Sequence, residues 1–122
     1  MSGADHLLPP HPHVVLIREG NHQEFNRLVA KGTEMHLAGA DLGATNLRLF
    51  AVERLDLSNA NLRQADLRGL DLRSCRLEGA LIIGARIEGA YFPSELSAEE
   101  IRLSHSHGTR LRYPSEAAAS PE

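Results

Sequence analysis

Hydrophobic positions recur every five residues between Met35 and Ser94. When this stretch is divided into twelve groups of five, the third position is always Leu, Val, Ile or Phe, and the first is most often Ala. All fourteen charged residues of the stretch fall on the second, fourth and fifth positions. Neither the helical period of about 3.6 residues nor the strand period of about 2 stays in phase with this pattern over such a length. The pattern therefore predicts a repeat architecture.

The first and third positions are expected to point inward, because none of them is charged. The third-position residues form the predicted core of the repeat. They are Leu37, Leu42, Leu47, Val52, Leu57, Leu62, Leu67, Leu72, Leu77, Ile82, Ile87 and Phe92.

Three of the groups, ADLGA at 40–44, ANLRQ at 60–64 and ADLRG at 65–69, resemble the A(D/N)LXX consensus of the pentapeptide-repeat family. The resemblance covers about half of the chain. It implies a mainly β fold: a right-handed quadrilateral β-helix of about three coils over residues 35–94, with one group per side and four per coil. Coils spaced like neighbouring strands would give a solenoid only about 15 Å tall.

In a four-sided coil, residues twenty apart should stack. The bulky first-position residues fall in two of the four columns, Met35–Leu55–Cys75 and Phe50–Leu70–Ala90. The other two columns hold Ala and one Thr. This segregation by volume suits a filled but not overpacked interior. The large Phe50 is expected to distort the first coil locally.

Both ends of a solenoid need caps. Residues 13–34 are predicted to form an N-terminal cap, with a strand over 13–18 followed by a short helix that begins at a capping box, 21–24. A second capping box at 97–100 opens a short helix in a C-terminal cap over 95–113. Residues 1–12 and 114–122 are rich in Pro, Ser, Ala and Gly and are expected to be disordered tails.

Composition fits a narrow coil. Hydrophobic residues make up 42% of the 122 residues but aromatics only 4%, and the formal net charge is −3. No apolar run approaches the roughly 20 residues of a membrane span, and the first residues lack a secretory layout. We therefore expect a cytoplasmic protein, with no membrane partner and no direct nucleic-acid binding.

The outer positions offer two candidate interaction features. Arg48, Arg63, Arg68 and Arg73 form either a patch for phosphate or carboxylate groups or a solvated face with Arg–Glu ladders.

In the third coil, the Asp and Asn of the second positions give way to other residues, so that Leu81, Ile83 and Tyr91 point outward. Either the C-terminal segment folds back over Leu81 and Ile83, or these residues contact a partner or a second copy of the chain.

Catalysis has no support in the sequence. Cys75, the only cysteine, occupies an inward first position and is expected to be a small core residue. His11 and His13, like His105 and His107, are two residues apart, and no Cys or carboxylate completes a recognisable metal set. No catalytic residue, metal or cofactor is expected.

The repeat predicts a non-enzymatic protein-interaction or scaffold module that self-associates through its C-terminal coil or binds another protein. The resemblance implies an alternative, because some members of the family bind DNA gyrase by mimicking duplex DNA. A mimic of this kind needs a long acidic rod. The repeats here carry seven acidic residues and seven Arg, so they are neutral.

Overall fold

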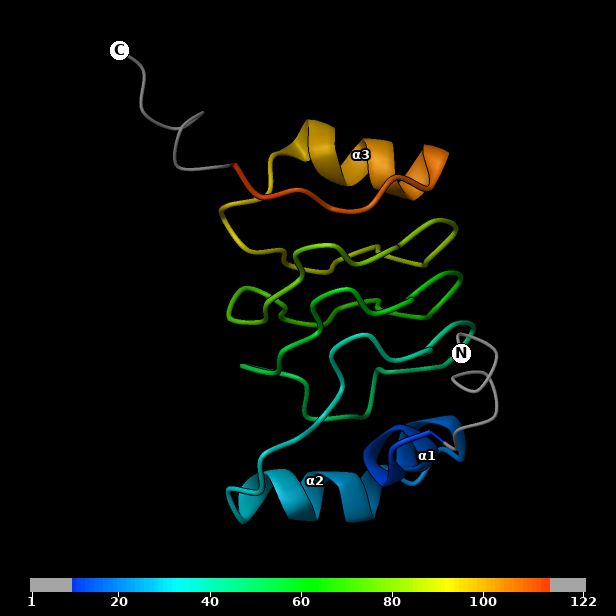
Figure 1. Ribbon diagram of the computed structural model, residues 1–122, viewed down its shortest axis with the longest axis vertical. Coiled ribbons are helices and arrows are strands. Elements are labelled where there is room, and N and C mark those ends of the chain that lie inside the picture. The colour runs from blue at the N-terminus through cyan, green and yellow to red at the C-terminus, as the bar shows by residue number, and fades with distance from the viewer. Residues whose placement is uncertain (1–9, 115–122) are drawn as a thin grey trace, which may run out of the picture.

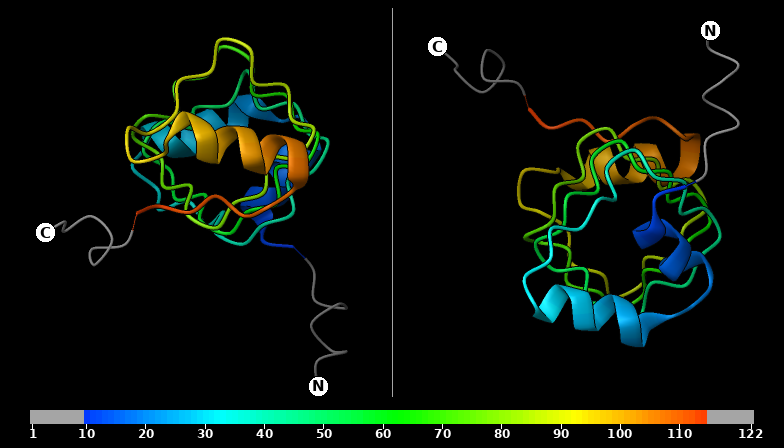
Figure 2. Two further views of the ribbon diagram at one scale, coloured as in Figure 1. Left: turned by 90° about the horizontal axis from the view of Figure 1, so that it is seen from above. Right: turned by 60° about the horizontal axis from the view of Figure 1, so that its bottom comes forward.

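The computed structural model describes residues 10–114, and the rest of both predicted tails lies outside this range. Coils of chain are stacked between two helices at one end and one helix at the other (Figure 1). Helices α1 (Pro12–Arg18) and α2 (His22–Ala30) precede the coils, and α3 (Ala98–His107) follows them. Seen along the stack, α3 and the segment after it lie across one end of the coils (Figure 2).

The coils are joined by parallel pairing between residues twenty apart. The bridges are Asp41–Asn61, Asn46–Asp66, Asp56–Arg76, Asn61–Leu81, Asp66–Arg86 and Asp71–Tyr91. All are isolated, and no longer strand occurs within residues 10–114. Because each side is only five residues long, the chain turns the next corner after a single bridge, and a bridged side therefore holds one bridge to the next coil. The structure thus shows the twenty-residue period, whereas the β-helix remains a prediction.

The first coil is less regular than the others, in agreement with the expectation for Phe50. Between the second and third coils all four sides are bridged, whereas the first and second coils are bridged on two sides only. The unbridged sides of the first coil are the first, residues 35–39, and the fourth, residues 50–54, which begins at Phe50. There the amide of Arg54 donates to Ser74 Oγ at 3.1 Å. Phe50 is buried and meets Phe25 of α2 edge to face, with 5.2 Å between ring centroids.

The predicted core lies inside the coils. Ten of the twelve third-position residues, from Leu37 to Ile82, are at most 2% exposed. Ile87 and Phe92, in the last two groups, are partly buried and pack against this cluster. Cys75 is also buried, and its Sγ donates to Val52 O at 2.9 Å. Burial raises the pKa of this thiol, which fits a core residue and not a nucleophile.

Left-handed backbone makes most of the corners. Nine fifth-position residues have positive φ, among them five glycines with φ between 70° and 82°. At Gly79 there is also no room for a side chain, because a Cβ would overlap Oδ1 of Asn59 one coil earlier.

We therefore expect Gly79→Ala to lower the free energy of unfolding by about 1–3 kcal/mol, from left-handed strain plus the overlap with Asn59. Gly39→Ala is the matched control, since its φ is 72° and nothing lies within 4 Å of its Cβ position. It should cost about 1 kcal/mol from strain alone. Urea unfolding followed by circular dichroism measures both. Equal losses in the two variants would contradict the added cost of the overlap and would mean that the Asn59 side chain turns aside without loss.

The predicted strand over 13–18 is wrong, because residues 12–18 form helix α1. The run of Val, Leu and Ile favours a strand locally, yet Val14 and Ile17 are buried at a helical spacing of three. His11 Nδ1 accepts from the amide of His13 at the helix start, and Pro12 occupies the first turn. Burial of one helical face outweighs the local preference.

Helix α2 agrees with the prediction and is tied to the coils. Asn21 Oδ1 accepts from the Glu24 amide at 3.2 Å, which is the N-cap half of the capping box. The other half does not form, since the Glu24 carboxylate binds Arg27. The side chain of Asn26 donates to Leu49 O and accepts from the Ala51 amide, at 2.9 and 2.7 Å.

The C-terminal cap closes the third coil. Ser97 caps α3 by accepting from the Glu100 amide, and Gly108 ends the helix with φ 78°. The chain then runs along the coil edge, where Leu111 exchanges two backbone hydrogen bonds with Gly79 and Ala80. These contacts supply partners for backbone groups that the last coil would otherwise leave open.

Candidate interaction surface

The register of the bridges places the candidate surface residues on three different sides of the coils. Leu81 lies under Asn61 on the second side, and Tyr91 lies under Asp71 on the fourth. These two sides are opposite in a four-sided coil. The structure therefore does not bring Leu81 and Tyr91 into one surface.

The fourth side holds an exposed aromatic residue with a cation against it. Tyr91 is 58% exposed, and the Arg73 guanidinium lies 5.0 Å from the centre of its ring. Arg73 also forms two hydrogen bonds to the Asp71 carboxylate, at 2.8 and 2.9 Å, which hold it in place. These bonds lower the pKa of Asp71 to about 2. The three side chains form a preorganised cluster, here called the Arg73–Tyr91 cluster.

Arginines on the coil pair within their own group instead of with Glu of the next coil. Arg68 binds Asp66 through two hydrogen bonds, at 2.8 and 2.9 Å, as Arg73 binds Asp71. The bonds from Arg68 lower the pKa of Asp66 to about 2. An Arg–Glu ladder would pair Arg68 with Glu88 and Arg73 with Glu53, each twenty residues away, but neither pair occurs among the ion pairs of residues 10–114. Residues two apart on one side of the coil both point outward. Each arginine therefore reaches the Asp of its own group before the Glu of the neighbouring coil.

Arg48 and Arg63 are exposed, and neither guanidinium takes part in an ion pair within the described part of the chain. With Arg68 neutralised by Asp66, the four arginines do not form a continuous cationic patch. The proposed phosphate or carboxylate site therefore gains no support from their geometry.

The C-terminal segment partly covers the apolar residues of the second side. Leu81 and Ile83 are both half-buried. Ile83 packs against the C-terminal end of α3, because its Cδ1 is 3.1 Å from the position that a Cβ on Gly108 would occupy. Gly84 also donates to His105 O at 3.2 Å. These contacts favour the fold-back interpretation for Ile83.

Two features escaped the sequence analysis. Leu49 is 64% exposed at a corner of the first coil, beside the fourth side. His11, His13 and His36 form a cluster of three rings with centroids 4.3, 4.9 and 5.8 Å apart. His36 lies 23 residues from His13 along the chain, and only the folding of α1 onto the first coil brings its ring near the other two.

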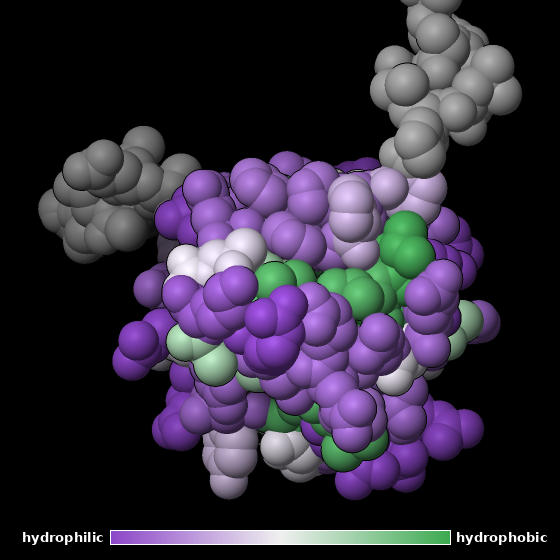
Figure 3. Space-filling model, turned by 90° about the horizontal axis from the view of Figure 1, so that it is seen from below, coloured by the Kyte–Doolittle hydropathy of each residue, from purple (hydrophilic) through white to green (hydrophobic). Residues whose placement is uncertain are grey.

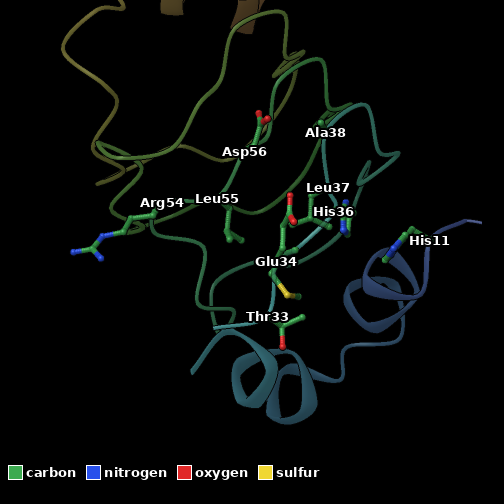
Figure 4. A pocket seen from close by; sticks show the side chains of 10 residues that line it. His11, Thr33, Glu34, His36, Leu37, Ala38, Arg54, Leu55 and Asp56 are labelled. Carbon is green, nitrogen blue, oxygen red and sulfur yellow. The ribbon is translucent and has the colours of Figure 1, made fainter. Parts of the chain in front are cut away.

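A pocket of about 590 Å³ opens between the N-terminal cap and the first two coils (Figure 4). His11 and His36 line it together with two acidic residues, Glu34 and Asp56, and with Arg54. Within residues 10–114, no group of three or more His, Cys, Asp or Glu side chains has the geometry to hold a metal ion. None of the helices described is long and apolar enough to cross a membrane.

Comparison with protein families identifies the repeat. The family model for pentapeptide repeats matches residues 54–92 in eight copies. Residues 54–92, about a third of the chain, are therefore pentapeptide repeats, as the A(D/N)LXX groups predicted. Neither the curated proteins nor the solved structures contain a match to the chain. Proteins of this family are generally structural or interaction modules and not enzymes.

Proposed function

We propose that residues 35–94 form a short right-handed quadrilateral β-helix and that the protein acts as a non-enzymatic protein-interaction module. Pairing at a spacing of twenty and the buried third positions support the first part. Such a coil holds side chains at fixed spacings on flat sides, which suits recognition more than catalysis. Caps at both ends leave the sides of the coils as the surfaces open to a partner.

The observation that carries the proposal is the Arg73–Tyr91 cluster. Tyr and Arg are the residue types, with Trp, that most often dominate binding energy at protein interfaces. The stacking of Arg73 on Tyr91 and its bonds to Asp71 restrict both side chains before binding. The binding of a partner over the ring therefore costs little further side-chain conformational entropy at this cluster.

Self-association through the third coil would use the same side. Helix α3 and residues 109–113 cover the end of this coil, so a second copy cannot extend the stack there. Tyr91 belongs to the third coil and is exposed on its side. A lateral contact between two copies is thus the form of self-association that we propose. The neutral charge of the repeats lends no support to mimicry of DNA.

Site-specific photo-cross-linking tests this proposal. A benzophenone side chain placed at Tyr91 should give a discrete adduct in cells that make the protein, either with a second copy or with another protein. The same probe at His107, an exposed residue of α3, is the matched control and should give no discrete adduct. Light scattering after gel filtration distinguishes the two kinds of partner.

Arg73→Ala should reduce the yield of the adduct from position 91 several-fold, because it removes the cation that orients the ring. Arg63→Ala, an exposed arginine on another side, should leave the yield unchanged. Equal adducts from positions 91 and 107, or none from position 91, would contradict an interface at this cluster.

A further inference from the structure

The three-histidine cluster joins the N-terminal cap to the first coil. His11 lies just before α1, His13 lies in its first turn, and His36 belongs to the first group of the repeat. The rings of His13 and His36 are stacked at an interplanar angle of 14°. His11 and His36 line one end of the pocket between the cap and the coils (Figure 4). From below, the surface of the cap is a mixture of polar and apolar areas (Figure 3).

Two hydrogen bonds in the cluster require neutral imidazole rings. The amide of His36 donates to His13 Nδ1 at 3.0 Å, and this bond connects the coil to α1. The amide of His13 donates to His11 Nδ1 at 3.0 Å, and this bond caps α1. A ring nitrogen accepts only while it carries no proton, since both nitrogens of an imidazolium are donors. Protonation of His13 therefore removes the connection to the coil.

We propose that His13, with the rings of His11 and His36 beside it, acts as a proton-sensitive latch, which strengthens the attachment of α1 to the first coil at neutral pH and weakens it in acid. The latch is defined as the His36 N–H to His13 Nδ1 bond. Histidine is the side chain whose ordinary pKa, about 6.5, lies within this range.

The surroundings of His13 oppose its protonation. Burial lowers the pKa of His13, and positive charge on His11 and on His36 lowers it further. Because the folded state disfavours the proton, the latch is fully stable above about pH 6.5 and loses stability as the pH falls below it.

The charged groups around the cluster are engaged elsewhere or face the other two rings. On α1, Arg18 donates to Asp41 O at 2.7 Å. On α2, Glu24 lines a groove with His13, but its carboxylate is held by Arg27.

From the coils, Glu34, Arg54 and Asp56 line the pocket on the side of His11 and His36. No carboxylate contributes to the pKa of His13, so none compensates for a proton on that ring.

Release is expected to be local. Helix α2 keeps its own ties to the coils through Phe25 and Asn26, neither of which is titratable, beside the edge-on contact of His22 with Phe50. The first coil is already unbridged on the side that carries His36. Acid should therefore make α1 and the start of the first coil open more often, by about the worth of one hydrogen bond, while Val14 and Ile17 stay buried in the closed form and the second and third coils stay folded.

Amide hydrogen exchange, corrected for intrinsic rates and recorded between pH 7.5 and 5.0 with EDTA present, tests the latch. Protection of the His36 and Glu19 amides should fall about tenfold as the pH drops, which is the worth of roughly one hydrogen bond. Protection of the Leu62 amide, which donates to Leu81 O, should not change.

His13→Asn separates protonation from packing, because the Asn amide oxygen can accept in place of Nδ1 but does not titrate. In this variant, and in His13→Ala, protection of the His36 amide should no longer depend on pH. His107→Asn on α3 should behave like the unchanged protein. The proposal is overturned if the unchanged protein keeps its protection at pH 5.0, if His13→Asn retains the pH dependence, or if the dependence appears only when Zn²⁺ replaces EDTA.

Discussion

Replacing Leu62 with Ala should lower the free energy of unfolding by about 3–5 kcal/mol. Leu62 is fully buried in the second coil. Leu42 and Ile82, twenty residues before and after it, are also fully buried, so the cavity has packed coils on both sides. The backbone bonds of Leu62 and its neighbours hold these coils at a fixed spacing, which prevents collapse around the missing atoms. Urea unfolding followed by circular dichroism measures the loss.

Leu49→Ala is the matched control, since the same atoms are removed from a side chain that is 64% exposed. We expect it to change the free energy of unfolding by less than about 0.5 kcal/mol. Similar losses in the two variants would mean that the third positions do not line a common core.

Phe25→Ala should destabilise the N-terminal cap by about 3–5 kcal/mol. This loss is of similar size to that expected for Leu62→Ala, but it should be confined to the cap. Phe25 is fully buried and packs edge to face against Phe50 at the irregular part of the first coil. Since α2 packs on this contact and α1 packs on α2, the amides of both helices should lose protection before those of Leu62 and Leu67. Hydrogen exchange read by amide-resolved NMR distinguishes this local loss from global unfolding.

Gln23→Ala, at an exposed position of the same helix, should leave the protection of α2 unchanged. If Phe25→Ala lowered the protection of all amides equally, the cap and the coils would form one cooperative unit, contrary to our interpretation.

The repeat could be predicted from the sequence because its signal is periodic. Charges are absent from the first and third positions over twelve groups, so a register follows without knowledge of any contact. The volumes at the first position also indicated where the coil would be irregular, and one of the two unbridged sides begins at Phe50. The start of α3 followed from the capping box at 97–100, where Ser97 Oγ accepts from the Glu100 amide.

Features that depend on contacts between distant residues could not be predicted. The run from Val14 to Ile17 has strand-forming residues, and only packing against the first coil selects a helix. His36 meets His13 for the same reason, 23 residues away along the chain. The pairing of the exposed arginines could not be predicted either. Whether Arg73 binds Asp71 or Glu53 depends on which carboxylate its guanidinium reaches in the folded structure.

The central claim is that the chain forms coils of twenty residues with one repeat group on each side. Scalar coupling across hydrogen bonds, measured by NMR between amide nitrogens and carbonyl carbons, tests it directly. We predict couplings from the Leu62 amide to the Leu81 carbonyl and from the Leu67 amide to the Arg86 carbonyl, whose N···O distances are both 2.8 Å. Couplings at another spacing, or couplings only within single groups, would contradict the coil.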